Sequence, residues 1–207
     1  MKSPIIKYVR TLLLAVLSGI TIGVGGVVYL STESKVVGAL MFTVGLYTIC
    51  IQGLNLFTGK VGYLFDNKPA YLIDLLIIWL GNLLGTMLTA LGVLQTRAAG
   101  IAETARTMCE TKLNDSYLSV VCLGIFCGML MFIAVDGYAK TKGNPVILFL
   151  GVATFILCGF EHCIADMFYF SIAQMWSAKT VLCIVLITLG NAVGGVLIPL
   201  VKKIPEK

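Results

Sequence analysis

Six long stretches of the chain carry no charged side chain. They are 18 to 24 residues long and cover residues 11–32, 36–59, 75–96, 116–135, 143–160 and 180–201. A helix of about 20 apolar residues is long enough to cross the roughly 30 Å of hydrocarbon in a bilayer. The pattern therefore predicts an all-α membrane protein with six transmembrane helices.

The second and fifth stretches belong to longer apolar segments that do not fit one straight helix. Residues 36–65 are interrupted only by Lys60, and residues 143–178 only by Glu161, His162 and Asp166. As a single helix the second segment would be about 54 Å long, which exceeds the bilayer. We therefore predict that both helices are broken. Because such backbone is tolerated at membrane depth only inside protein or beside a water-filled cavity, the breaks also mark the expected pathway.

The chain contains an internal repeat. Three pairs of short motifs recur in the same order, at offsets of 105, 109 and 111 residues: SGITIG at 18–23 with LGIFCG at 123–128, GNLLG at 81–85 with GNAVG at 190–194, and NLF at 55–57 with DMF at 166–168. Three helices per repeat would invert the second half relative to the first. Inverted repeats are typical of transporters and channels, with the pathway at the repeat interface.

These observations predict a single transmembrane domain over residues 1–207. Repeat one covers about 1–95 and repeat two about 116–207, joined by a connector at 96–115. Within the connector, an apolar stripe at helical spacing is formed by Ile101, Ala105, Met108 and Leu113. A short amphipathic helix and a solvated connector are both compatible with that stripe.

Composition supports a membrane protein and excludes a soluble nucleic-acid-binding one. Apolar residues make up 58% and charged residues 12% of the chain, whereas about a quarter of a soluble domain is charged. The net charge of +5 is unevenly distributed. Five basic residues lie in the first, third and fifth loops, and ten lie in the other loops and termini: Lys2, Lys7, Arg10, Lys60, Lys68, Lys140, Lys142, Lys202, Lys203 and Lys207. The positive-inside rule then predicts a multi-pass protein of the cell (inner) membrane with both termini in the cytoplasm.

Glu161, His162 and Asp166 are the only ionisable cluster within a predicted span, and His162 is the only histidine. Ionisable groups in the membrane usually mark function, because each costs several kcal/mol to bury there. Each also has a structural interpretation. Glu161 could accept hydrogen bonds from the broken helix, His162 could be a buried structural histidine, and Asp166 could face His162 or the cavity rim.

In the first half, the break is followed by Leu56, Phe57 and Thr58, which offer apolar bulk and one hydroxyl group. Phe42 and Leu46 lie one turn apart on the preceding half-helix, and Phe155 lies on the half-helix before the second break. These apolar side chains are compatible with a gate in the pathway or with ordinary core packing.

The motifs resemble those of the formate/nitrite transporter family. The resemblance is carried by GFEHCIADMF at 159–168, LNLFTG at 54–59, CLGIFC at 122–127 and the two Gly-Asn pairs, and it extends over all six spans. It implies an aquaporin-like fold with inverted three-helix repeats and broken second and fifth helices. It also implies a homopentamer with one pore per subunit for small weak-acid anions such as formate, nitrite, hydrosulfide, acetate or lactate.

The resemblance assigns roles to individual residues. His162 resembles the single pore histidine, and Thr58 the threonine on the loop that interrupts the second helix, where Leu56 and Phe57 also lie. The apolar constrictions above and below the histidine are matched by Phe42, Leu46 and Phe155.

The sequence departs from the family pattern at two positions. A lysine is expected eighteen residues before the histidine, where this chain has Asn144, and Lys142 is a candidate substitute. An asparagine is expected four residues after the histidine, where this chain has Asp166. Both departures weaken the attraction for an anion.

The sequence therefore predicts a pentameric channel or transporter for a small weak-acid anion, with formate as the first candidate. The anion would take a proton near His162 and pass the constriction as the neutral acid. Nitrite or hydrosulfide is an alternative substrate, and the sequence names neither the anion nor the direction of flow. No enzyme activity, cofactor, metal or nucleic-acid partner is predicted, only the anion, lipid and further copies of the chain.

Two other functions are compatible with the same cluster. In an ion-coupled secondary transporter, Asp166 would bind a proton or Na⁺. In an intramembrane enzyme, His162 and Asp166 would act together, but the chain has one histidine and lacks a second metal-ligand cluster.

Overall fold

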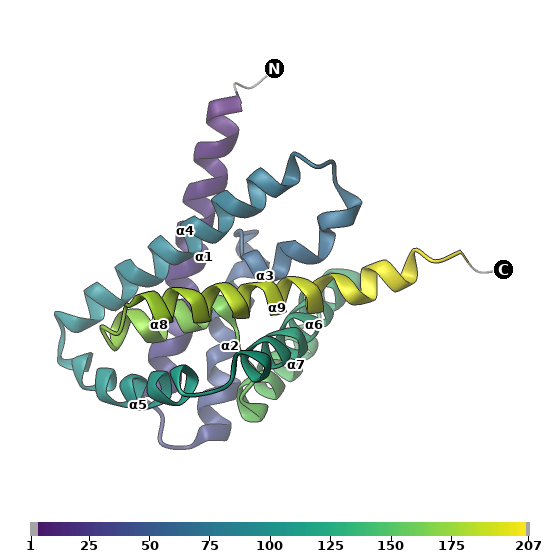
Figure 1. The fold of residues 1–207 in the computed structure, drawn as a ribbon. Coiled ribbons are helices and arrows are strands. Elements are labelled where there is room, and N and C mark those ends of the chain that lie inside the picture. Colours follow the sequence, from purple (N-terminus) through teal and green to yellow (C-terminus); the bar gives the residue numbers. More distant parts are fainter. Residues whose placement is uncertain (1–3, 206–207) are drawn as a thin grey trace.

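The computed structural model describes residues 4–205, and Lys2 and Lys207 of the charge count lie outside that range. In Figure 1 the described chain folds entirely into helices and connecting segments. Five helices are long and apolar enough to cross a membrane: α1 (Pro4–Leu30), α2 (Lys35–Gln52), α4 (Tyr71–Leu94), α6 (Tyr117–Lys140) and α9 (Ala178–Lys202). A sixth crossing is provided by α7 (Val146–Cys158) and α8 (Cys163–Ile172), which are bent by 57° at their junction. The fold class predicted from the charge-free stretches is confirmed.

Both predicted breaks are present, and each begins at a glycine. α2 ends at Gln52 and α7 at Cys158, and the next residues, Gly53 and Gly159, have φ angles of +63° and +71°. This left-handed conformation is easily adopted only by glycine. The residue after each glycine donates its N–H to a carbonyl of the last helical turn, at 2.9 Å in both breaks. The two helices thus end by the same motif.

The chain re-enters helical structure four residues after each glycine begins the break. In the first half, α3 (Phe57–Lys60) is followed by a short 3₁₀ helix, η1 (Val61–Asp66). In the second half, α8 is ten residues long. Leu56 and His162 occupy the N-cap positions of α3 and α8, both with extended backbone. These two residues are therefore structural equivalents.

One asparagine in each half holds the break in place. Asn82 on α4 accepts a hydrogen bond from the Phe57 N–H (2.9 Å) and donates to the carbonyls of Asn55 and Ala15, both at 2.8 Å. Asn191 on α9 does the same in the second half, with Cys163, Glu161 and Gly124 as its partners at 2.9, 2.8 and 2.8 Å. The Gly-Asn pairs found in the sequence are thus the centres of the two repeats.

This equivalence corrects two of the three offsets predicted from the sequence. The pair Asn82 and Asn191 keeps its offset of 109, and the helix residues they contact share it. The SGITIG and LGIFCG motifs, aligned at 105, are one helical turn out of register, because Gly19 lies against Asn82 as Gly128 lies against Asn191. The NLF and DMF motifs are also misaligned, because Phe57 matches Cys163 in its bond to asparagine.

Within each half the outer helices pack closely, α1 on α4 and α6 on α9, while α2 and α7 pack on each other across the halves. Glycine permits the close approach: a Cβ on Gly85 would lie 2.1 Å from the Val16 carbonyl oxygen, and one on Gly194 would lie 1.9 Å from that of Ile125. α8 lies in the interior, in contact with α1, α4, α5 and α9.

The connector is helical, as one of its two interpretations predicted. A 3₁₀ turn, η2 (Arg97–Gly100), leads into α5 (Ile101–Leu113). Figure 1 shows α5 joining α4 to α6 at one edge of the molecule. Ala105 and Cys109 on this helix are fully buried, and α5 packs on α8. The apolar stripe therefore seats the helix against the second break.

Candidate functional site

Two cavities enter the molecule from opposite ends of α2. The first cavity, of about 310 Å³, is lined by Lys35 at the start of α2 and by residues of α1, α5, α7, α8 and the second break. The second cavity, of about 340 Å³, is lined by Ile49 and Cys50 near the end of α2, by the first break, and by Lys60, Tyr63 and Tyr138. Fourteen residues of α-helix separate Lys35 from Ile49, a distance of about 21 Å.

Between the cavities lies a buried apolar barrier. Phe42 and Leu46, on the stretch of α2 between the two cavities, are each 1% exposed. The Phe42 ring meets the Phe155 ring of α7 edge-on, with centroids 6.0 Å apart. Phe155 also lines the first cavity, whereas Leu56 lines the second. A solute that moves between the cavities has to pass these side chains.

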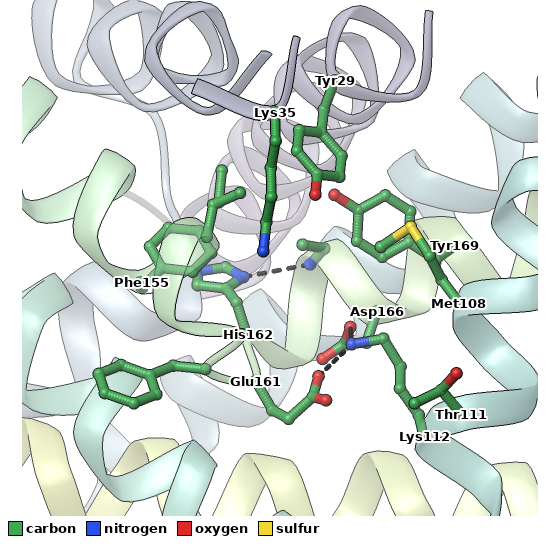
Figure 2. Close-up of a pocket in the computed structure, with 14 residues that line it drawn as sticks. Tyr29, Lys35, Met108, Thr111, Lys112, Phe155, Glu161, His162, Asp166 and Tyr169 are labelled. Atoms are coloured by element: carbon green, nitrogen blue, oxygen red, sulfur yellow. Dashed lines mark hydrogen bonds and ion pairs between the residues drawn. The ribbon is translucent and has the colours of Figure 1, made fainter. Parts of the chain in front are cut away.

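His162 and Thr58 form a polar pair within the barrier. The Thr58 Oγ1 and His162 Nε2 atoms are 2.9 Å apart, and both residues are buried. The imidazole stacks on Phe155 with a centroid separation of 5.5 Å. The other ring nitrogen, Nδ1, accepts a hydrogen bond from the Ala165 N–H at 3.1 Å and so caps α8, as Figure 2 shows. Because Nδ1 is an acceptor, a neutral imidazole carries its proton on Nε2 and donates it to Thr58.

Glu161 and Asp166 do not face His162 but meet a lysine from the connector. The Lys112 ammonium on α5 is ion-paired with the Glu161 carboxylate and lies 3.0 Å from Asp166 Oδ1. Figure 2 shows the three side chains converging beside the first cavity, with the imidazole turned away from them. The interpretation of Glu161 as a partner for the freed backbone N–H groups is therefore incomplete, because its carboxylate binds an ammonium group.

Lys112 is nearly buried, with 12% of its side chain exposed. Burial disfavours the charged ammonium, but the adjacent Asp166 and Glu161 outweigh it and raise the pKa of Lys112 above its ordinary value. The lysine therefore stays charged at every physiological pH.

The structure does not bring Asn144 or Lys142 to either cavity. Both are exposed just before α7, where the Asn144 side chain accepts a hydrogen bond from the Val146 N–H. The thirteen residues of α7 place this end of the helix about 20 Å from the second break. A fixed spacing along the sequence therefore pointed to the wrong end of α7, and the basic groups of the first cavity are Lys35 and Lys112.

Phe57 is buried, but it does not line either of the two cavities. Its backbone N–H binds Asn82, so its position in the fold serves the break. Thr58, one residue later, reaches the histidine across the interface of the two halves.

Sequence analysis missed Lys112, although one signal was available. Lys112 follows Ala105 by seven residues and Met108 by four, which places it on the apolar face of α5. A lysine in phase with an apolar stripe needs an anionic partner when the stripe is buried. The two carboxylates without an assigned partner were Glu161 and Asp166.

Comparison with known proteins agrees with this architecture. The chain is 25% identical over 236 residues to the formate channel FocA of Escherichia coli K12, covering 90% of this chain and 82% of FocA. It is 28% identical over 201 residues to the formate-nitrite transporter of Plasmodium knowlesi, covering 80% of this chain and 64% of that protein.

Two solved structures share the fold. A pentameric formate channel with formate bound superposes with a TM-score of 0.80 at 24% identity, over 97% of both chains. An FNT family ion channel superposes with a TM-score of 0.81 at 20% identity, over 98% of this chain and 92% of the other. The family model for formate/nitrite transporters matches residues 2–203. The chain is therefore a multi-pass membrane protein that belongs to the formate/nitrite transporter family.

Proposed function

We propose that this protein is a channel for small monovalent weak-acid anions, with formate as its first candidate substrate. The observation that carries the proposal is the pair of cavities separated by Phe42, Phe155 and one buried His162–Thr58 pair. A barrier of this kind suits a molecule with three or four heavy atoms that is uncharged while it crosses.

The barrier favours the protonated form of the substrate. Burying an isolated anion among apolar side chains costs many kcal/mol, whereas a neutral acid avoids most of that cost. A neutral acid still has a hydroxyl and a carbonyl group, which lose their hydrogen bonds to water in the barrier. The His162–Thr58 pair supplies polar contacts at that point, and His162 is well placed to hydrogen-bond the substrate or relay a proton.

The first cavity is suited to attracting the anion. Lys35 reaches over it from the start of α2, and its Nζ donates to the Leu157 carbonyl at 3.3 Å, close to the end of α7. This ammonium has no carboxylate within ion-pair distance among residues 4–205. An unshared positive charge at the mouth raises the local anion concentration, most strongly at low salt.

Formate is preferred to nitrite or hydrosulfide on the printed functions of FocA of Escherichia coli and of the superposed formate channel. The same superposed channel is pentameric, and we extend that assembly to this chain. The uneven distribution of basic residues places both termini in the cytoplasm of a cell with this protein in its inner membrane.

Flux into proteoliposomes tests the proposal. Purified protein is reconstituted, and the uptake of formate, nitrite, hydrosulfide and lactate is measured at several pH values, with empty liposomes as the control. We expect formate to pass faster than lactate and uptake to stop at equilibrium. Flux of all four substrates at the level of empty liposomes would refute the channel. Concentrative uptake that collapses with a proton or Na⁺ gradient would instead establish a secondary transporter.

Mass measurement in mild detergent tests the assembly. We expect a single species of five subunits, each of 22.2 kDa. A stable monomer or trimer as the sole species would contradict a pentamer.

A further inference from the structure

The ion cluster beside the first cavity contains two carboxylates but one ammonium group. Lys112 contacts Glu161 and Asp166, whose side chains are 7% and 2% exposed. If both acids were ionised, this buried cluster would carry a net charge of −1. A buried charge without a partner is costly, and here it would also repel the anions that enter the cavity.

One oxygen of this cluster has no partner. Asp166 Oδ1 faces Lys112 at 3.0 Å, but Asp166 Oδ2 is buried and makes no hydrogen bond within residues 4–205. Asp166 also lines the first cavity, and Figure 2 shows its carboxyl group on the cavity side of Lys112. A proton on Oδ2 would make the cluster neutral and would give this oxygen a hydrogen-bond donor directed at a guest molecule.

The remaining titratable groups around Asp166 do not alter this charge count. They are thiols and phenols from every neighbouring element: Cys109 on α5, Cys127 on α6, Cys163 and Tyr169 on α8, Cys183 on α9, and Tyr29 on α1. Such groups are mostly neutral near pH 7, and burial raises the pKa of Cys109 to about 12. Lys35 lies at the cavity mouth, where it holds the Leu157 carbonyl instead of a carboxylate.

We propose that Asp166 carries an exchangeable proton and donates it to the permeating anion, which makes the channel acid-activated. The inference rests on the proposed function and deepens it. The O–H bond on Asp166 breaks, a new O–H bond forms on the substrate oxygen, and Asp166 is left as a carboxylate beside Lys112. The neutral acid crosses the barrier and releases its proton in the second cavity. Water in the first cavity then returns a proton to Asp166, so the net movement is one anion with one proton.

This arrangement has a defined pH dependence. Above the apparent pKa of the cluster, the protonated fraction of Asp166 falls about tenfold for each pH unit. The ionised cluster both lacks the proton and repels the anion. An Asp166→Asn variant would lack the proton but would also lack the charge, so its cluster stays neutral at every pH.

Formate flux of the wild type and of Asp166→Asn, measured from pH 5 to pH 8.5, tests the inference. We expect the ratio of variant to wild-type flux to be lowest at acid pH and to rise by up to about tenfold per pH unit on the alkaline side. The matched control is Asp115→Asn, because Asp115 is an exposed aspartate preceding α6 whose hydrogen bonds to Ser116 and Ser119 an amide can largely retain. It removes the same charge from the surface and should leave the ratio independent of pH.

Infrared difference spectroscopy of the pentamer in lipid gives a second readout that does not need transport. The wild type should show a protonated-carboxyl band that titrates, and Asp166→Asn should lack it while Asp115→Asn keeps it.

Each outcome is decisive. A wild-type band together with a pH-dependent flux ratio supports the inference. Parallel pH profiles, or the same titrating band in Asp166→Asn, would overturn it while leaving the channel function intact. If neither protein transports any substrate, the channel function fails, and the infrared titration alone decides whether Asp166 holds an exchangeable proton.

Discussion

The two breaks share a backbone and differ in their chemistry. Each begins at a left-handed glycine and is held by three hydrogen bonds to one asparagine. At the equivalent N-cap positions, however, the first half has Leu56 and the second has His162. At the preceding position the first half has Asn55 and the second has Glu161. One repeat therefore supplies an apolar wall, and the other supplies the ionisable groups.

The difference separates the residues that build the pathway from those that tune it. The glycines and asparagines occur in both halves because both breaks need the same backbone geometry. His162, Glu161 and Asp166 occur in one half only, and α5 brings Lys112 to that half alone. Removing the shared residues should damage both halves equally, whereas removing the unshared ones should alter transport or stability from one side.

The largest expected effect comes from the shared asparagines. Asn82→Ala and Asn191→Ala each leave three buried backbone groups without their partner, at about 1–3 kcal/mol for each group. We expect both variants to lose most of their folded protein in fluorescence-detected size-exclusion chromatography. Asn67→Ala is the control, because the Asn67 side chain is exposed and makes one hydrogen bond, to the Tyr63 carbonyl. If one asparagine proves dispensable while the other does not, the two breaks are not held in the same way.

Lys112 gives the next largest effect. Lys112→Met leaves two buried carboxylates without a cation, which costs about 3–5 kcal/mol when a buried pair is broken from one side. Lys60→Met, in the second cavity, is the matched change in the other half, and it should cost far less because Lys60 has no ion-pair partner in the described residues.

The pH dependence of this difference follows from the raised pKa of Lys112. A raised folded-state pKa stabilises the protein fully below the unfolded-state value near 10.4, and that contribution is lost only as pH rises through the folded-state value. The gap in thermal stability between wild type and Lys112→Met should therefore persist unchanged from pH 7 to pH 9. A gap that closes over this interval would show that Lys112 titrates there.

His162 should affect flux more than folding. His162→Phe preserves bulk but removes the contact to Thr58, and the loss of one polar contact worth about 0.5–1.5 kcal/mol corresponds to a roughly 2- to 10-fold change in formate flux. It should also reduce the pH dependence. Thr58→Val removes the same contact from the first half without disturbing the α8 cap, so a comparable fall there assigns the effect to the pair. Wild-type flux in both variants would exclude the pair from permeation.

The smallest expected effect is at the apolar barrier. Phe42→Ala and Phe155→Ala should each speed flux several-fold or admit lactate, because both rings lie between the cavities. Leu46→Ala should act in the same direction. Phe149→Ala on α7 is the control, since Phe149 faces outward with 38% exposure. Unchanged flux and selectivity in the three barrier variants, at equal amounts of folded protein, would remove these residues from the pathway.

The sequence predicted the parts of the structure that follow from local pattern. Charge-free stretches located the spans, and the excess length of residues 143–178 located the break at Gly159. The stripe on residues 101–113 predicted α5 as one of two possibilities. Each of these features depends on residues within one segment, where hydrophobic spacing and backbone preference are decisive.

Contacts between segments were harder to predict. The Gly-Asn pairs were recognised as a repeat, but nothing in them showed that Asn82 and Asn191 bind the breaks. The basic group expected at Asn144 is supplied by Lys112, 49 residues before Glu161 in sequence. An ion pair between residues so far apart in the chain is set by how α5 packs on α8, which spacing along the chain does not encode.

The asparagine bonds also determine how fast the pathway can respond. Because Asn82 and Asn191 bind each break to its neighbouring helices, widening the barrier by unwinding backbone would sacrifice several buried hydrogen bonds. Rotation of the Phe42 and Phe155 rings sacrifices none. Side-chain rotations take picoseconds to nanoseconds when unhindered, whereas collective helix movements take microseconds to milliseconds. A rigid backbone with a barrier made of side chains thus lets permeation follow the clock of single rotamers, with no large conformational cycle for each molecule that crosses.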